Sequence, residues 1–373
     1  MAISARPLYP YSAVLVASYG GPEKPEDVLP FMRNATAGRG VPDERLVEVS
    51  QHYMLFGGKS PINDENHALM EALRAEFTRR GLDIPVVIGN RNWHPFHAET
   101  VADLVAAGHS RVLGLPTSAY HCYSSCRQYG EDLQRAMEGA AAAGHPIQID
   151  RVAPFAETDG FIQAQIDVTT EAFRAMRKQD PDGTIRILFS THSIPHTMNE
   201  ASGDGTPGAS YREQHLRVAT DVAAGVRERV GEFFEWELVY NSRSGPAYIP
   251  WLEPDINDVI TKLPAQGVSS VVTVPLGFIS AHMEVVFDLD TEASATAAET
   301  GIGFIRAATV GTHPAFVSML ADRLLERAAV ARGDASSEAQ ALYSDDFDCC
   351  HLRPVEASGA AASPRVRTAS TTA

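Results

Sequence analysis

The stretch SVVTVPLGFISAHMEVVFDLDTE, residues 270–292, joins a short apolar run directly to a segment rich in acids. Its first nine residues are mostly β-branched or apolar, which is typical of a strand buried on both faces of a parallel sheet. In the second part, Glu284, Asp288 and Glu292 follow one another at intervals of four residues. A helix would place these three carboxylates on one face. A strand followed at once by a helix predicts a parallel α/β sheet.

The three spaced carboxylates have two interpretations. Like charges four residues apart on a helix repel each other, so their alignment needs a reason. In one interpretation they form the solvated face of an otherwise apolar helix. In the other they line a polar passage that handles a cation or protons. The segment alone does not decide between the two.

The same alternation of strand and helix runs through most of the chain. Apolar runs of strand length lie at 13–21, 85–93, 111–118, 184–193, 237–243, 270–278 and 304–311. Helical patterns separate them, which predicts parallel sheets covered by helices on both faces. Two segments, 90–120 and 241–282, also share a spacing, since a proline and a glycine precede a strand-end proline by the same intervals (Pro95, Gly108, Pro116 and Pro254, Gly267, Pro275).

This internal echo predicts an α/β protein built from two similar halves. We expect an N-terminal half over 1–160 and a C-terminal half over 161–333. A polar tail that carries cysteines follows over 334–352. Residues 353–373 are small, polar and low in complexity, so we expect them to be disordered.

Composition narrows the classes of function. The formal net charge is −16 over 373 residues, which argues against a broad nucleic-acid surface. The apolar runs reach only strand length, so we expect no integral membrane segment. The N-terminus lacks the pattern of an export signal, and we therefore expect a cytoplasmic protein.

Two residues at strand ends are candidates for chemistry, because ligands of open α/β sheets bind beyond the carboxyl ends of strands. His192 follows the apolar run of 184–193 and could accept a proton near neutral pH. A capping or core histidine is the alternative for His192. Tyr19 ends the first strand before two glycines, and a simple turn tyrosine is its alternative.

Several polar side chains suit a ligand with carboxylates. Arginine donates two parallel hydrogen bonds to a carboxylate, and hydroxyl groups are good single donors. The candidates lie in glycine- and proline-containing loops and after the third strand, at Arg33, Arg45, Ser60, Ser124, Ser125 and Tyr129. Scattered charge in solvated loops is the alternative.

The chain has four cysteines, Cys122, Cys126, Cys349 and Cys350. Structural disulfides are rare in a reducing cytoplasm. Cys122 and Cys126 stand one helical turn apart, so the two pairs could supply one four-ligand metal site. Four free thiols are the alternative.

Six segments, taken in order, resemble those of the ferrochelatases, enzymes that insert ferrous iron into a porphyrin. LFSTHSIP resembles the family's strand-end histidine motif, and SAHMEVVFDLDTE resembles its H-x-E helix with following acids. The other four are SYGGPEKPEDV, HYMLFGGKSPI, NRNWHPF and YNSRSGPAYIPWLEPDI. The matches span about residues 12–330.

The resemblance implies two Rossmann-like domains with a porphyrin cleft between them. His192 and Glu284 would be the catalytic pair on one face of the macrocycle, with Tyr19 on the other. Together with Asp288 and Glu292, the pair would also bind the metal. The family's helix is locally widened to π geometry. Whether its acids carry protons outward or iron inward stays open.

The resemblance also implies the substrates. Ferrous iron is the metal, and the polar, arginine-bearing loop RNATAGRGVPDER favours coproporphyrin III over protoporphyrin IX. The alternatives are a protoporphyrin enzyme, a cobalt chelatase of the same class, and a two-lobed metal- or haem-binding protein. We expect a monomer that has transient contact with the next enzyme of the haem pathway.

The resemblance implies one cofactor. Many actinobacterial and animal ferrochelatases hold a [2Fe-2S] cluster on one internal and three C-terminal cysteines. This chain departs from that pattern, because Cys122 and Cys126 are internal and Cys349 and Cys350 are adjacent. A four-cysteine cluster is one expectation; His121 or His351 in place of one thiol is the other.

Overall fold

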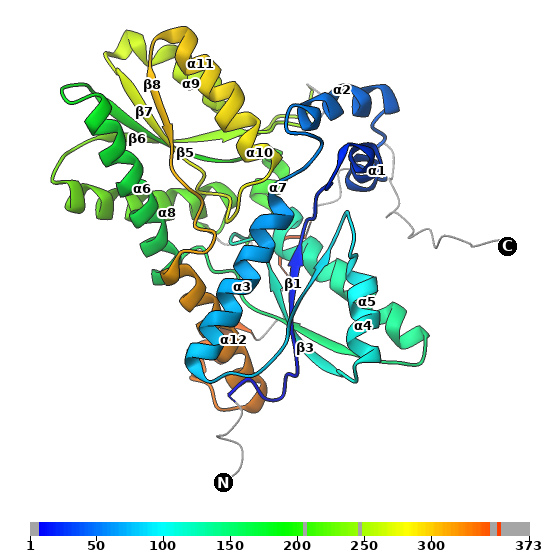
Figure 1. The fold of residues 1–373 in the computed structure, drawn as a ribbon. Helices are drawn as coiled ribbons and strands as arrows, with labels where there is room; N and C mark the ends of the chain where they lie inside the picture. The colour runs from blue at the N-terminus through cyan, green and yellow to red at the C-terminus, as the bar shows by residue number, and fades with distance from the viewer. Residues whose placement is uncertain (1–6, 204–206, 245–247, 344–348, 352–373) are drawn as a thin grey trace.

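The computed structural model describes residues 7–203, 207–244, 248–343 and 349–351. Its strands form two parallel four-stranded sheets, one in each half of the molecule (Figure 1). The first sheet contains β1 (Val14–Ser18), β2 (Val86–Asn90), β3 (Arg111–Pro116) and β4 (Gln148–Arg151). The second contains β5 (Ile185–His192), β6 (Glu235–Asn241), β7 (Ser270–Val274) and β8 (Gly303–Arg306). The predicted α/β class with parallel sheets is confirmed.

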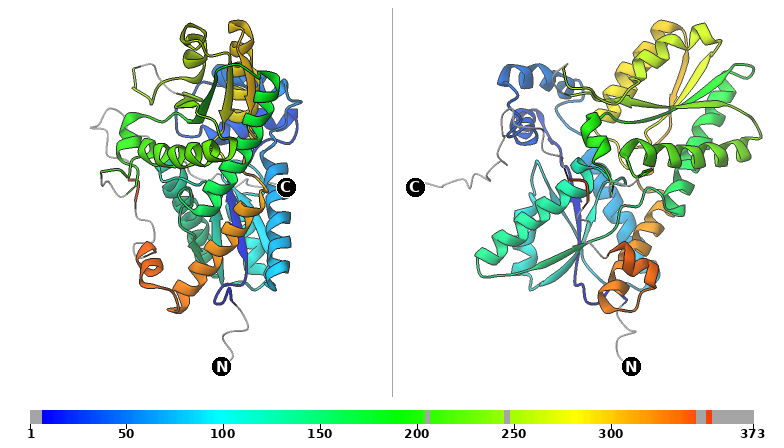
Figure 2. Two further views of the ribbon diagram at one scale, coloured as in Figure 1. Left: turned by 90° about the vertical axis from the view of Figure 1, so that its left-hand side faces the viewer. Right: turned by 180° about the vertical axis from the view of Figure 1, so that it is seen from behind.

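Helices cover both faces of each sheet, as Figures 1 and 2 show. The helices of the first half are α1 (Pro25–Ala35), α2 (Asp43–Met54), α3 (Ile62–Arg80), α4 (His97–Ala106) and α5 (Gln128–Ala142). Those that follow are α6 (Asp159–Gln179), α7 (His196–Glu200), α8 (Tyr211–Val230), α9 (Ile256–Lys262), α10 (Met283–Val286), α11 (Ser294–Thr300), α12 (Pro314–Arg332) and α13 (Ser337–Leu342). Two π-helical turns, η2 (Tyr123–Arg127) and η4 (Asp288–Ala293), and a 3₁₀ turn, η3 (Pro264–Gln266), complete the list.

The two halves share one topology. The strand orders are β2-β1-β3-β4 and β6-β5-β7-β8, so each half repeats the same arrangement. The echoed prolines also take matching places: the carbonyl of Pro95 accepts from the backbone NH of Asn90 at 2.7 Å, and that of Pro254 from Tyr240 at 2.9 Å. The repeat read from sequence spacing is therefore present in the fold.

The apolar core runs through both halves. One cluster of buried side chains joins the inner faces of the two sheets, for example Leu113 of β3 and Ile187 of β5, through α3, α6, α8 and α12. Separate clusters lie between the first sheet and α4 and α5, and between the second sheet and α9 and α11. Helix α12 packs on α3 and on α6, so the last long helix ties the halves together. The division of the chain near residue 160 stays a prediction.

The fold bears on two other expectations. Among the described residues, no helix has both the length and the apolar character needed to cross a bilayer. The tail predicted to be disordered, 353–373, lies outside the described residues, and so do Gly245, Pro246 and Ala247 of the segment YNSRSGPAYIPWLEPDI.

Candidate active site

Two side chains of the second half meet beyond the carboxyl end of its sheet. His192 is the last residue of β5, and Glu284 lies in the first turn of α10. The imidazole Nε2 of His192 is 3.3 Å from the carboxylate Oε1 of Glu284. The side chains keep 28% and 45% of their surface exposed, so the pair is open to a ligand. The other ring nitrogen of His192 contacts the carbonyl of Ser193, which is an acceptor.

Each member of the pair holds the other in its charged form. Burial alone would lower the pKa of His192, but the charge and hydrogen bond of Glu284, together with Ser193 and Asp288, outweigh burial and raise this pKa to about 9. Burial would raise the pKa of Glu284, but His192 lowers it to about 2. At neutral pH the imidazolium therefore faces a carboxylate.

The helix that carries Glu284 widens after its first turn. The ring of His282 caps α10, since its Nδ1 accepts from the backbone NH of Glu284 at 3.2 Å. In η4, the NH of Glu292 donates to the carbonyl of Phe287, five residues earlier, at 3.0 Å. The π geometry that the resemblance implied is confirmed.

Asp288 lies on the widened turn and is held by the end of β6. Asn241 donates its side-chain NH to Asp288 Oδ2 at 3.0 Å, and the hydroxyl of Ser242 contacts the same oxygen. Burial and the negative charge of Glu284 raise the pKa of Asp288, whereas the two hydrogen bonds lower it. The result is a pKa of about 6. Asp288 is therefore a carboxyl group that can gain and lose a proton near neutral pH.

Two further acids lie on η4. Glu292 is exposed, and its charge contributes to the raised pKa of Asp288, so the two carboxylates are electrostatic neighbours. Asp290 points elsewhere and pairs with Arg306 of β8, with one contact at 2.9 Å. Asp290 is therefore not part of the group formed by Glu284, Asp288 and Glu292.

Tyr19 approaches this group from the first half. It follows β1 and leaves 37% of its surface exposed. Burial raises the pKa of the Tyr19 phenol, and the negative charge of Glu284 raises it further. Gly20 lets the chain turn here at φ +77°, where a Cβ would lie only 2.8 Å from Asn90 Cβ. Tyr19 is therefore close enough to Glu284 for the charge of this carboxylate to act on its phenol, and its place opposite the pair stays a prediction.

A ring contact joins the halves beside this site. His52 of α2 stacks on Phe287, with ring centroids 3.8 Å apart and planes 13° from parallel. Figure 1 shows α1 and α2 standing together on the same side as α10. Phe31 of α1 packs edge-on against Tyr19 at 6.1 Å, so this helix pair also supports the tyrosine.

The candidate carboxylate-binding residues of the first two helices are differently placed. Arg33 pairs with Asp43 at 2.8 Å, and Arg45 pairs with Glu48 at 2.5 Å; both arginines are exposed. Ser60 is buried beside Gly21. Their role in binding a porphyrin stays a prediction.

The three candidates after β3 lie deeper. Ser125 is buried and donates to the carbonyl of Tyr120 at 2.6 Å. Tyr129 is buried under Arg91, whose guanidinium lies 4.2 Å from the ring centre and also contacts the Ser124 carbonyl at 3.3 Å. These residues therefore support Arg91 and the loop after β3, and a contact with substrate stays a prediction.

Arg39 lies in the same arginine-bearing stretch as Arg33 and Arg45, and its charge acts on the site. Arg39 is exposed in the loop between α1 and α2, and its charge opposes the raised pKa of Tyr19 and contributes to the lowered pKa of Glu284. Among the residues that the structure describes, no ion pair is found for Arg39. The sequence marks this loop as rich in arginine but does not show which arginine faces the pair.

The Ferrochelatase family profile matches residues 11–328, which is most of the chain. The chain belongs to the ferrochelatase family. It is 48% identical over 328 residues to a protein of Streptomyces coelicolor named coproporphyrin III ferrochelatase, which covers 87% of each chain. Proteins of the same name from Leifsonia xyli (48% over 330 residues, 85% of this chain and 84% of the relative) and Streptomyces griseus (45% over 368 residues, 96% and 98%) are also similar.

This ferrochelatase has a second group of metal-binding side chains. The ligand atoms of His121, Cys126, Cys349 and Cys350 all lie within 4.8 Å of one another. Cys122 does not join them: its thiol contacts the hydroxyls of Ser124 and Ser125 at 3.2 and 3.3 Å. The structure thus brings together three of the four predicted cysteines with a histidine.

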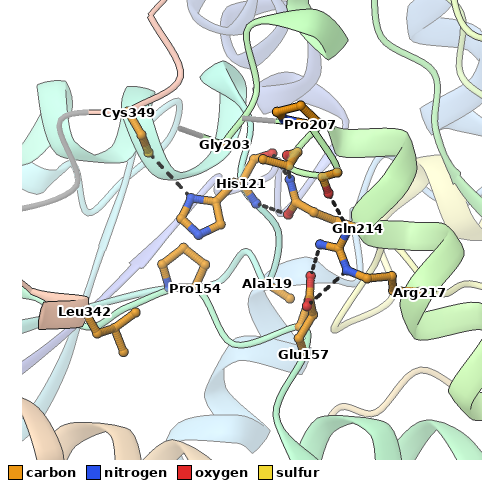
Figure 3. Close-up of a pocket in the computed structure, with 13 residues that line it drawn as sticks. Ala119, His121, Pro154, Glu157, Gly203, Pro207, Gln214, Arg217, Leu342 and Cys349 are labelled. Carbon is orange, nitrogen blue, oxygen red and sulfur yellow. Dashed lines mark hydrogen bonds and ion pairs between the residues drawn. The ribbon is translucent and has the colours of Figure 1, made fainter. Parts of the chain in front are cut away.

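A pocket of about 570 Å³ borders this group rather than the His192–Glu284 pair. Figure 3 shows the imidazole of His121 directed toward Cys349, with Gln214 beside it. Arg217 and Glu157 form an ion pair on the far wall of the pocket. The second group is therefore separate from the candidate active site and reachable from outside.

Proposed function

We propose that this ferrochelatase inserts ferrous iron into coproporphyrin III, in the pathway of haem biosynthesis. The observation that carries the proposal is the 3.3 Å pair of His192 and Glu284, beyond the sheet of the second α/β half of a family member. The proteins of Streptomyces and Leifsonia named coproporphyrin III ferrochelatase support this porphyrin as the substrate.

The residues of the pair suit the exchange that insertion requires. One Fe²⁺ enters as two pyrrole protons leave, so the site needs a group that binds the ion and a group that accepts protons. Carboxylate and imidazole are both ligands for ferrous iron. Glu284 stays ionised and offers an anionic ligand, whereas His192 must give up its proton before it can bind the metal or act as a base.

We assign Asp288 and Glu292 to proton transfer rather than to iron delivery. A pKa of about 6 lets Asp288 exchange protons at neutral pH. Asn241 and Ser242 both donate to Asp288 Oδ2 and so hold this carboxyl group in a fixed position beside Glu284. Exposed Glu292 then connects this group to solvent.

The propionates of the substrate need cationic partners. Coproporphyrin III has more propionates than protoporphyrin IX, and arginine is well suited to bind them. We propose that Arg39 contacts a propionate, together with the predicted Arg33 and Arg45. The loop that carries Arg39 joins α1 and α2, beside Tyr19.

An anaerobic insertion assay tests the function. Purified protein is mixed with Fe²⁺ and either coproporphyrin III or protoporphyrin IX, and the shift of the Soret band is followed. We expect faster insertion into coproporphyrin III, and we expect Arg39→Ala to raise KM for it more than for protoporphyrin IX. Equal rates with both porphyrins would refute the substrate assignment, and no shift with either would refute the function.

The expected [2Fe-2S] cluster does not fit the second group as the structure places it. Three thiols and one imidazole are suitable donors for iron–sulfur or zinc centres. However, a [2Fe-2S] cluster divides its terminal ligands between two irons, so the four ligands do not surround one point. The four ligand atoms here all lie within 4.8 Å of one another. We therefore assign no step of the reaction to a cluster.

A further inference from the structure

The second group is compact. Cys126 Sγ lies 3.6 Å from Cys349 Sγ and 3.4 Å from Cys350 Sγ. The Nδ1 atom of His121 lies 3.8 Å from Cys126 Sγ and 3.5 Å from Cys349 Sγ. No two of these atoms are close enough for a disulfide, whose sulfurs are about 2.05 Å apart.

These spacings match a single tetrahedral ion. With Zn–S of about 2.3 Å and Zn–N of about 2.0 Å, the ligand atoms of a tetrahedral zinc lie ~3.5–3.8 Å from one another. Four of the six separations span 3.4–3.8 Å, and the other two are no longer than 4.8 Å. A Cys₃His set is also one of the common ligand sets of structural zinc.

We propose that His121, Cys126, Cys349 and Cys350 bind one Zn²⁺ ion in a closed structural site. The site joins a tail segment to the loop after β3, more than 220 residues away in the chain. The ion stabilises this connection, since metal binding at such a site contributes directly to folding free energy. The site is independent of the porphyrin substrate and of the His192–Glu284 pair.

The surroundings orient the ligands. Two hydrogen bonds with the side-chain amide of Gln214 fix the backbone of His121. The backbone NH of His121 donates to Gln214 Oε1 at 2.8 Å, and Gln214 Nε2 donates to the carbonyl of His121 at 3.1 Å. The backbone NH of Gly203 points at Cys350 Sγ from 3.2 Å. Such outer contacts hold metal ligands in place and favour the thiolate form.

The conformation of the local backbone explains why the side chain of His121, and not that of Cys122, lies with the other ligand atoms. Cys122 is the residue before η2 and has an extended backbone, with φ −161° and ψ 171°. Neighbouring side chains in extended backbone point to opposite sides. His121 therefore faces the tail, and Cys122 turns into the protein, where 3% of its surface is exposed.

Metal analysis of the full-length protein tests the proposal. The background is the double variant His192→Ala, Glu284→Gln, so that metal at the active site is not counted. Protein purified without oxygen is analysed for zinc, iron and acid-labile sulfide, and Co²⁺ is then exchanged for the bound metal. We expect about one zinc per chain, no visible absorbance, and the d–d bands of tetrahedral thiolate-bound cobalt.

Ligand variants supply the second readout. His121→Ala, Cys126→Ser and Cys349→Ser should each lose the ion or shift the cobalt spectrum, whereas the matched control Cys122→Ser should keep both. Two irons with two sulfides per chain would overturn the single-ion site. Metal loss in Cys122→Ser with retention in His121→Ala would overturn the ligand set. A metal-free protein, with thiols free or oxidised, would overturn the site altogether.

Discussion

Replacing Glu284 by Gln should change the protonation state of His192. In the wild-type protein, burial lowers the pKa of His192, but the carboxylate 3.3 Å away raises it to about 9. At pH 7.5, a pKa of about 9 gives roughly 30 imidazolium groups for each neutral imidazole. Gln removes the charge but keeps the size of the side chain, so the pKa should fall to near or below its ordinary value of about 6.5. The neutral form would then exceed the charged form about tenfold at pH 7.5, a change of roughly 300-fold in their ratio.

The assay is an NMR titration of metal-free protein labelled at histidine, with the His192 signals assigned through His192→Gln. Glu292→Gln is the matched control, because this exposed acid is not among the groups that shift the pKa of His192.

The raised pKa of His192 also makes the stability of the protein depend on pH. The added stability is fully present below about pH 6.5 and is lost as pH rises through about 9. Between about pH 6.5 and pH 9, the free energy of unfolding should therefore fall more for the wild-type protein than for the Glu284→Gln variant. The reasoning fails if His192 titrates near 6.5 in the wild type, or if Glu284→Gln leaves its pKa unchanged.

Three other perturbations probe the site and the fold. His192→Ala should lower the rate of insertion at least about a hundredfold while quenching of porphyrin fluorescence still reports binding; a wild-type rate would remove this residue from the chemistry. Asp288→Asn should abolish the ionisation near pH 6 in the pH profile of turnover, because burial raises the pKa of Asp288 to about 6, whereas the control Asp290→Asn should leave the profile intact. Tyr11→Phe should lower the free energy of unfolding by about 1–3 kcal/mol, measured in urea, because buried Asp150 loses a 2.6 Å hydrogen bond; unchanged stability would contradict this.

Strand composition and spacing made most of the fold predictable. The seven expected strands are present, because each is a β-branched or apolar run that ends at glycine, proline or a polar motif. The eighth, β4, was missed: its four residues, Gln148–Arg151, alternate polar and apolar side chains over too short a length to stand out. Its pairing with β3 comes from tertiary context.

The proximity of His192 and Glu284 was predictable from the strand-end histidine and the acidic helix, whereas their neighbours were not, and the catalytic role of the pair stays a prediction. Asn241 and Ser242 hold Asp288 from β6, and no spacing in the sequence links them to η4. Similarly, Cys122 and Cys126 stand four residues apart, but helical spacing does not apply to Cys122, whose backbone is extended. Soluble cytoplasmic location, monomeric state and contact with a later enzyme of the pathway stay predictions.

The stacked rings of His52 and Phe287 have a consequence for the exchange of ligands. Several contacts join the halves, among them α12 against α3 and α6, Tyr120 stacked on His215, and the His52–Phe287 ring pair beside the candidate active site. The two halves cannot separate near the active site while His52 and Phe287 remain stacked. Any widening of the space between α2 and α10 would therefore require these two rings to slide past each other or to part.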